Sequence, residues 1–376
     1  MATNIGASYD PPSTAAALAE AYVSSRQNML TTQSQRATAT EAALAKLKSA
    51  ISTYQSTLLL LSSTKTMLSR TAVFDNAVGT ATATATATAG SYSFFVERLA
   101  TANQVAFGGL ADRPAGTYGK FTLQVGAGVP FTVNLDTANT DPATPLTPRE
   151  IAAAINAEPG NAGKVSASVV TIGETAELVL TAQTTGAASQ ITLDTTDLTD
   201  ATLAASLDGA NARQLVAAQD ALIWLGPQGT LPNPPAAGTG TPIIQASNTF
   251  NNIDGVSMTF TKVQASGEAP VTLTVAADNA GTTANVQKFV DAYNKLKSAI
   301  DALVDAGDPS EGVAAGAFSN DAGIRALQDR MVSILRQPDP SGTTVAAYGI
   351  IASRDGTLSL DSARLTKQLA VNPNGL

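Results

Sequence analysis

The chain has 376 residues, of which 22 are lysine or arginine and 30 are aspartate or glutamate, and it contains neither histidine nor cysteine. These absences exclude disulfides, thiolate metal sites and cysteine nucleophiles, and they remove the side chain that most often serves as general base or metal ligand. The formal net charge of −8 argues against a general nucleic-acid binder, because such proteins present a basic surface.

The N-terminal forty residues predict a helix that is weak on its own. Residues 1–10 contain no lysine or arginine and no apolar stretch, so we expect no cleaved secretory signal. Ser13 can cap a helix, but the apolar residues that follow are sparse among alanine, serine, threonine and glutamine: Leu18, Tyr22, Met29 and Leu30. We therefore expect residues 1–40 to form a weakly ordered arm that is marginal without a partner.

A heptad pattern begins at residue 44. Apolar residues recur at alternating spacings of three and four, Leu68 continues the pattern, and Lys65 interrupts it once. The narrow stripe is typical of a coiled-coil or bundle seam, and apolar runs such as residues 58–61 are far too short to span a bilayer. The predicted seam positions here are Leu44, Leu47, Ile51, Tyr54, Leu58 and Leu61.

Between Phe74 and Asp278 the periodicity changes to two, which predicts β-structure. Threonine and alanine alternate over residues 80–89, and a strand is expected over residues 91–96. Asp254-Gly255 is a hairpin dipeptide between apolar segments. We also expect strands at 256–263 and 271–276 to pair across a turn at Ser266-Gly267.

Residues 107–212 predict a small inserted α+β domain. Alternating strands at 121–125 and 131–135 flank a glycine turn, and Thr147-Pro148-Arg149-Glu150 combines an N-cap, a proline at N1 and a capping-box glutamate. The helix that this motif opens is followed by strands near 165–172, 177–181 and 191–193.

Two further amphipathic helices follow the β region. The first repeats the same alternating spacing, and the second is shorter. Burying each leucine or isoleucine is worth roughly 1.5–3 kcal/mol, so three such helices favour one bundle over three separate surface helices. The predicted seam positions are Val286, Phe289, Tyr293, Leu296, Ile300 and Leu303, then Ile324, Leu327, Met331 and Ile334.

The resulting prediction is a multidomain α+β protein. A split, coiled-coil-like helical bundle from the two chain ends carries a β-rich head, and the head carries the inserted α+β domain. The expected domains are an N-terminal arm at 1–40, a helical stalk at 41–73 plus 281–376, a β-rich head domain at 74–106 plus 213–280, and the insert at 107–212.

No motif in the sequence indicates catalysis, a cofactor or a metal. The stretch Gly160 to Val165 lacks the first glycine and the Ser or Thr of a phosphate loop, so a turn followed by a strand is expected. Asp194, Asp197 and Asp200 match no calcium-loop spacing and are expected to cap turns on the surface. Aromatic residues make up only 5% of the chain, which argues against a sugar-stacking cleft, and Trp224 is expected in a core or at an interface.

Several stretches, in colinear order, resemble blocks of the bacterial flagellar filament cap family, also called hook-associated protein 2. In this family a helix carries Phe-Val, Tyr-Asn and Leu, as residues 289–296 do here. The insert also resembles a small repeat of flagellar axial proteins. The other blocks are Ala218–Ala221, Ser247–Thr249 with Ile253–Val256, Asp321–Arg336 and Gly349–Asp361.

The resemblance implies a non-enzymatic, extracellular assembly protein at the flagellum tip, exported through the flagellar channel without a cleaved signal. Its copies would form a ring homo-oligomer and promote flagellin polymerisation. Hook–filament junction proteins, an export chaperone and host mucin are further expected partners. Family members continue beyond the last block into helices that partner the N-terminal arm, so residues 1–40 are expected to be poorly packed here.

Two alternatives remain open at this stage. The chain could be another axial protein, such as a hook–filament junction subunit or a flagellin. It could also be an adhesin whose β-rich head binds glycans or mucin.

Overall fold

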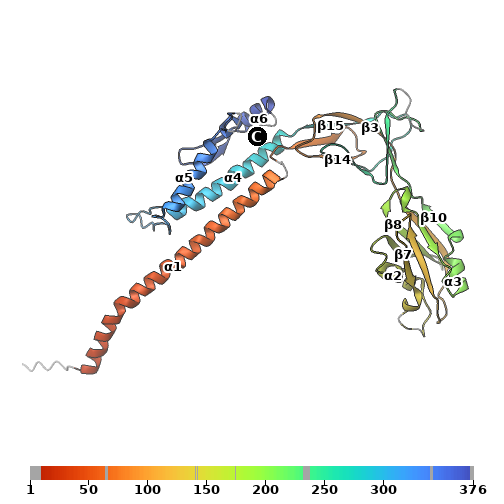
Figure 1. The fold of residues 1–376 in the computed structure, drawn as a ribbon, viewed down its shortest axis with the longest axis horizontal. Coiled ribbons are helices and arrows are strands. Elements are labelled where there is room, and N and C mark those ends of the chain that lie inside the picture. The colour runs from red at the N-terminus through yellow and green to blue at the C-terminus, as the bar shows by residue number, and fades with distance from the viewer. Residues whose placement is uncertain are drawn as a thin grey trace, which may run out of the picture. The chain divides into compact units, whose positions relative to one another are not determined.

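The computed structural model describes residues 10–63, 67–139, 141, 143–173, 175–231, 238–338 and 342–372. The chain divides into two compact units, residues 1–69 with 278–376 and residues 70–277 (Figure 1). The predicted fold class is confirmed, since α1 pairs with α4 and the middle of the chain is antiparallel β-structure. None of the helices among the described residues has the length and apolar character needed to cross a membrane.

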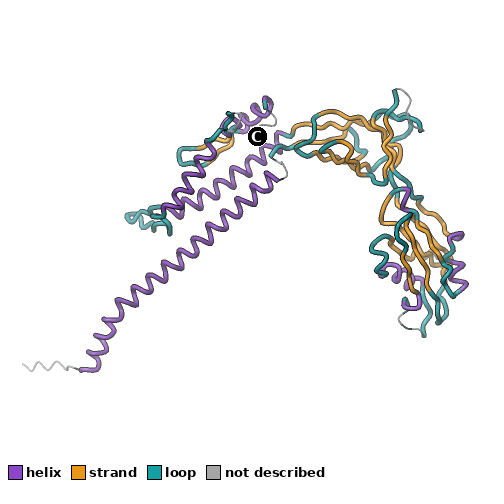
Figure 2. The backbone as a smooth tube through the Cα atoms, in the orientation of Figure 1, coloured by secondary structure: helices purple, strands orange, loops and turns teal. Residues whose placement is uncertain are grey.

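The helical unit contains both ends of the described chain (Figure 2). Each of its last three helices begins at an aspartate whose side chain accepts a hydrogen bond from a backbone N–H of the first turn: Asp278, Asp321 and Asp361. Such caps satisfy N–H groups that lack a partner within the helix. The elements are α1 (Pro11–Ser63), α4 (Asn279–Val304), α5 (Ala322–Arg336), the 3₁₀ turn η4 (Val345–Tyr348), β16 (Ile350–Ala352), β17 (Leu358–Leu360) and α6 (Ser362–Val371).

The predicted separation of a weak arm from the stalk helix is not what the structure shows, because α1 runs without interruption from Pro11 to Ser63. Nearly every described residue before Ala43 is nevertheless exposed. The C-terminal part of α1 packs on α4 and so keeps the helix formed. Alanine, glutamine and serine can extend such a helix toward the N-terminus, because extending a helix costs far less free energy than starting one.

The second unit is built around an eight-stranded antiparallel sheet. Its core brings together four of the chain's phenylalanines, with the rings of Phe250 and Phe260 5.4 Å apart and nearly perpendicular. In spatial order the strands are β12 (Thr241–Gln245), β11 (Ala221–Leu225), β3 (Gly90–Arg98), β15 (Val271–Ala277), β1 (Arg70–Phe74), β2 (Gly79–Ala83), β14 (Val256–Phe260) and β13 (Thr249–Ile253).

The Asp254-Gly255 hairpin is confirmed: Ile253 pairs with Val256, and Gly255 has a φ of +72°. The expected pairing of residues 256–263 with 271–276 is wrong, because β14 pairs with β2 and β13, whereas β15 pairs with β1 and β3. The segment after Phe260 does not turn back. Instead, Thr261 and Gln264 donate backbone hydrogen bonds to Val78 and Val96 on other parts of the sheet.

The described residues of the insert form two small sheets and two helices. The four-stranded sheet has the order β10 (Ala212–Val216), β4 (Ala102–Leu110), β8 (Thr175–Thr185), β7 (Val165–Ile172). The three-stranded sheet has the order β6 (Phe131–Asn134), β5 (Lys120–Val125), β9 (Ile191–Asp194). Helix α2 (Pro148–Ala157) packs on β7, and the predicted capping box at Thr147 and Glu150 is confirmed. The remaining elements are α3 (Ala201–Ser206) and the 3₁₀ turns η1 (Leu135–Thr137), η2 (Ala187–Ser189) and η3 (Gly209–Asn211).

Element boundaries differ by a few residues from those expected. Arg70–Phe74 is a strand paired with β15, so the helical unit ends at Ser69 rather than at residue 73. Strand β4 begins at Ala102, before the expected start of the insert. In both places the strand pairs with a strand that is distant in the sequence, and it includes residues whose local sequence does not indicate β-structure.

The structure gives structural roles to the residues considered for chemistry. Asp200 caps α3 and bonds to Arg113 Nε at 2.9 Å. Burial opposes ionisation of its carboxyl, but the hydrogen bonds from Leu203, Thr202 and Arg113 outweigh it and lower the pKa. Trp224 is 1% exposed, packs with Phe95, and donates from Nε1 to Glu97 at 2.5 Å.

Candidate functional site: the helical seam and its exposed continuation

Helices α1 and α4 lie side by side along the C-terminal part of α1 (Figure 2). A buried cluster joins Ala43 and Leu47 of α1 to Leu296, Ile300 and Leu303 of α4. Ile51 and Tyr54 pack against this cluster, as do Ile324 and Met331 of α5. Residues more than two hundred positions apart in the sequence thus share one apolar core.

The predicted seam residues fall into three groups by exposure. Seven are buried: Leu47, Leu61, Val286, Tyr293, Leu296, Ile300 and Leu303. Six are partly buried: Ile51, Tyr54, Leu58, Phe289, Ile324 and Met331. Three are exposed, which corrects their assignment to the seam within the chain: Leu44, Leu327 and Ile334.

The corrections have a common cause, which is the period of the stripe. On α1 the face against α4 includes Ala43 in place of Leu44. On α5 the residues that pack are Ile324, Met331 and Leu335. Their spacings of seven and four follow the 3.6-residue period of a straight helix, whereas the prediction assumed the 3.5-residue period of a supercoil.

A second cluster docks the β16–β17 hairpin onto α4. Tyr293 is 1% exposed, and its hydroxyl donates to the carbonyl of Gly356 at 3.3 Å. The next residue, Asn294, bonds to Leu358 in both directions, donating to its carbonyl and accepting from its N–H at 2.8 Å. The role of Asn294 was missed from the sequence, although the Tyr-Asn pair belongs to the stretch that resembles the cap family.

Lys297 is a second residue that the sequence did not single out. It is 5% exposed, and its ammonium lies 2.6 Å from the carboxylate of Asp301, which also accepts a bond from Gln328 of α5. The network links α4 and α5. The carboxylate of Asp301 is itself 39% exposed, so water screens the pair and its contribution to stability is small.

Two tyrosines make the helical unit sensitive to high pH. Burial raises the pKa of Tyr54 above its ordinary value, and burial, with smaller contributions from Tyr54 and Asp301, raises the pKa of Tyr293. Because the folded state holds both rings neutral, stability is fully present below the unfolded pKa of about 10 and falls as the pH rises through the folded values. Thermal unfolding followed by circular dichroism should show this loss, and Tyr54→Phe combined with Tyr293→Phe should flatten it.

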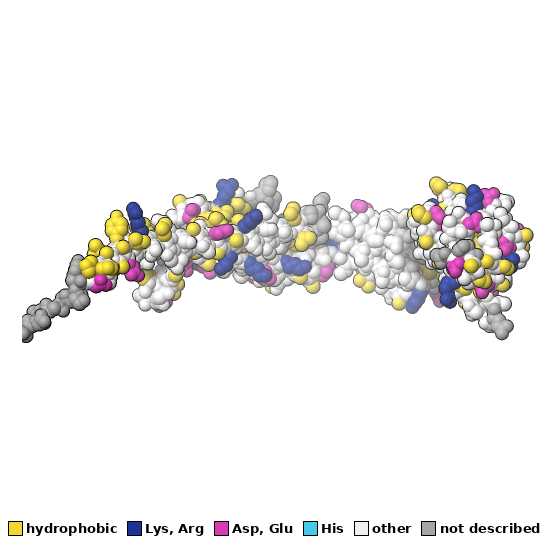
Figure 3. All heavy atoms as spheres, turned by 90° about the horizontal axis from the view of Figure 1, so that it is seen from below, with side chains coloured by type: hydrophobic (Ala, Val, Ile, Leu, Met, Phe, Trp, Pro, Cys, Tyr) yellow, Lys and Arg dark blue, Asp and Glu magenta, His cyan; other side chains and the backbone are white. Residues whose placement is uncertain are grey.

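The face of α1 that packs on α4 continues beyond α4. Met29 lies five helical turns before Leu47, and Tyr22 and Leu18 lie about seven and eight turns before it, so a regular 3.6-residue period places all three on the face of Leu47. Their exposed fractions are 57%, 80% and 73%. Figure 3 shows hydrophobic side chains gathered on this end of the helix. We call Leu18, Tyr22 and Met29 the open seam.

In the second unit, a side-chain amide fixes the backbone at the entry to the insert. Asn248, from the Ser-Asn-Thr stretch, bonds to both the N–H and the carbonyl of Ala100, at 2.7 and 2.9 Å, and so holds the chain where it enters the insert.

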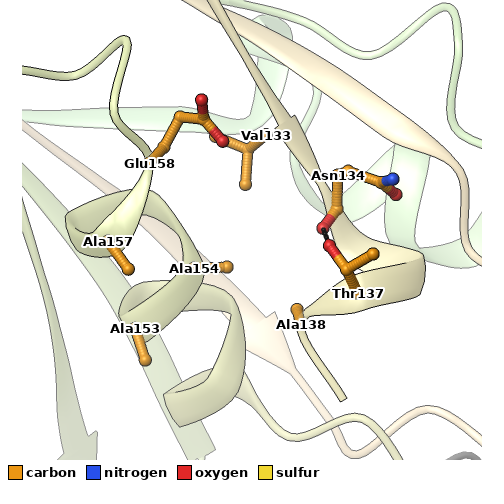
Figure 4. Close-up of a pocket in the computed structure, with 8 residues that line it drawn as sticks. All are labelled: Val133, Asn134, Thr137, Ala138, Ala153, Ala154, Ala157 and Glu158. Carbon is orange, nitrogen blue, oxygen red and sulfur yellow. Dashed lines mark hydrogen bonds between the residues drawn. The ribbon is translucent and has the colours of Figure 1, made fainter. Parts of the chain in front are cut away.

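A cavity of about 320 Å³ lies beside α2, lined by Val133, Asn134, Thr137, Ala138, Ala153, Ala154, Ala157 and Glu158 (Figure 4). Four of its eight lining residues are alanine, and none carries an aromatic ring. Within the described residues, no group of three or more acidic side chains is arranged to hold a metal.

Comparison with known proteins gives matches to one family. Models described as the N-terminus and the C-terminus of flagellar hook-associated protein 2 match residues 7–103 and 238–376. The lateral flagellar hook-associated protein 2 of Vibrio parahaemolyticus is 33% identical over 311 residues, covering 81% of this chain and 66% of that protein. The B-type protein of Pseudomonas aeruginosa is 31% identical over 374 residues, covering 93% and 74%.

A solved structure matches most of the chain. The crystal structure of the D1-D2-D3 domains of the flagellar cap protein FliD from Escherichia coli aligns with a TM-score of 0.65 and 25% identity. The alignment covers 89% of this chain and 88% of that one. The chain spans about two thirds of the length of the Vibrio relative.

Proposed function

This chain belongs to the flagellar hook-associated protein 2 family, the filament-cap proteins, and we propose that it is a non-enzymatic cap subunit that promotes flagellin polymerisation at the flagellum tip. The proposal rests on this membership and on the open seam, an apolar face continuous with a packed one and left without a cover among the described residues.

The partners we propose are further copies of the chain and flagellin. The family forms an oligomeric cap, and an exposed apolar helix face suits contact with another helix. Contacts with hook–filament junction proteins and an export chaperone are proposed on the family resemblance alone. The cavity beside α2 does not favour a glycan-binding head, because it offers no ring for a sugar to stack on.

A matched pair of variants tests the open seam. Leu18→Gln, Tyr22→Gln and Met29→Gln together remove its apolar character with helix-compatible side chains. In cells lacking the native protein, this variant should leave flagellin in the medium and produce no filaments. The control carries Val23→Gln and Leu30→Gln, which lie on the same part of the helix, about a quarter turn or more away, and are 45% and 64% exposed.

The control should restore filament growth. If the open-seam variant restores filaments equally well, the helix face has no part in assembly. If deletion of the protein leaves filaments of normal length and no flagellin in the medium, the cap assignment itself is wrong.

A further inference from the structure

Strand β7 forms one edge of the four-stranded sheet, and among the described residues it pairs with β8 alone. In an antiparallel pair the backbone groups of successive residues point alternately toward the partner and away from it. Asn156, which belongs to neither strand, bonds to the backbone of Ala167, so the backbone groups of Ala167 point away from β8. By alternation, the residues whose backbone groups point outward are Val165, Ala167, Val169 and Thr171. These four positions decide what the edge can bind.

Two asparagines close the first half of the edge. Asn161 accepts from the N–H of Val165 and donates to its carbonyl, both at 2.9 Å. Asn156, at the end of α2, does the same for Ala167 at 2.9 and 2.7 Å. Each side-chain amide takes the place of a neighbouring strand's peptide group, so a further strand cannot add along this half.

The second half of the edge is open. Nothing in the described part of the chain bonds to the outward N–H and carbonyl of Val169 or Thr171. Val170 and Ile172, on the exposed face of the sheet, are 44% and 58% accessible. Residues 165–172 contain no charged residue and no proline, the features that usually protect an exposed edge from pairing.

We propose that the open half of β7 pairs with the same segment of a second copy of this chain, extending the two sheets into one. In the antiparallel register that places Val170 opposite itself, Val169 of each copy exchanges backbone hydrogen bonds with Thr171 of the other. Val170 then meets Val170 on the shared face, and Ile172 lies over Ser168.

The occupant is argued from the length and chemistry of the edge. Asn156 stops any strand that continues past Ala167, so only a short partner fits, and the open segment is its own complement in length. Self-pairing of an uncharged strand brings no like charges together. The interface goes beyond the proposed function, because it follows from the edge of the insert and requires neither flagellin nor the open seam.

The absence of cysteine makes cross-linking a clean test on the full 376-residue chain. In the proposed register, the two Val170 Cα atoms are about 4.5 Å apart, within disulfide reach. Val170→Cys should therefore give a covalent dimer under mild oxidation. Val129→Cys, in the β5–β6 turn and 76% exposed, should give none at the same concentration, and Ser168→Cys should link only when Ile172→Cys is present.

Two further variants test the pairing without a disulfide. Thr171→Pro removes an outward N–H while leaving the bonds to β8, and Val170→Lys places like charges at the centre of the interface. Both should lose the dimer in sedimentation velocity while keeping the wild-type circular dichroism spectrum. Equal cross-linking of Val170→Cys and Val129→Cys overturns the interface. Whether filaments grow with either variant tests only the pairing and not the cap role, because the deletion experiment tests the cap role separately.

Discussion

Leu47→Asp is expected to unfold the helical unit or to lower its free energy of unfolding by about 3–5 kcal/mol. Leu47 is 6% exposed and lies among Ala43, Leu296 and Ile300. The substitution removes buried methyl groups and places a carboxylate among the apolar side chains of this described cluster, where no cation is present to pair with it. Circular dichroism at 222 nm during thermal unfolding measures the loss, because α1 and α4 supply much of the helix signal.

Leu44→Asp is the matched control. Leu44 is three residues away on the same helix but 50% exposed, so this change should alter stability by no more than about 0.5 kcal/mol. Similar melting of the two variants would mean that α1 does not pack on α4 through this face. Leu47→Ala, expected to cost about 2–5 kcal/mol, separates the loss of packing from the cost of the charge.

Local signals in the sequence predict the elements well. The capping box before α2, the Asp254-Gly255 hairpin and the heptad-like stripes each depend on residues within a few positions of one another. The meeting of α1 with α4 also follows from local patterns, because a helix with one apolar face must cover it. The need to cover an apolar helix face is the same wherever the helix lies in the chain.

Strand partners and stripe register could not be predicted in the same way. β14 pairs with β2, more than 170 residues earlier, and nothing in either strand distinguishes that partner from β15. Buried Gln264 decides the path of the next segment by accepting from Val96 N–H and donating to the carbonyl of Ala269. Such contacts depend on the assembled fold.

The candidate site was predicted in its apolar part and missed in its polar part. The sequence patterns pointed to Leu47, Tyr293 and Ile300, all buried. Asn294 and Lys297 were passed over because polar residues between stripe positions are normally solvated. Their partners, Leu358 and Asp301, become evident only when the hairpin and α5 are placed against α4.

Tyr293→Ala is expected to cost about 3–5 kcal/mol and to release the β16–β17 hairpin from α4. The ring is almost fully buried in the cluster that includes Val290, Tyr348 and Leu365, so its removal leaves a cavity with contributions from α4, η4 and α6. Urea unfolding reports the stability, and limited proteolysis between residues 350 and 360 reports the release of the hairpin.

Tyr293→Phe is the control that separates the ring from its hydroxyl. It keeps the packing and loses only the 3.3 Å bond to the carbonyl of Gly356, so a loss of about 0.5–1.5 kcal/mol is expected, with the hairpin still protected from protease. If the hairpin stays protected from protease in Tyr293→Ala, its docking depends on Asn294 instead, because the two bonds from Asn294 to Leu358 do not need the tyrosine ring. Asn294→Leu should then expose it, because the change breaks both bonds and leaves the Leu358 backbone without its partner.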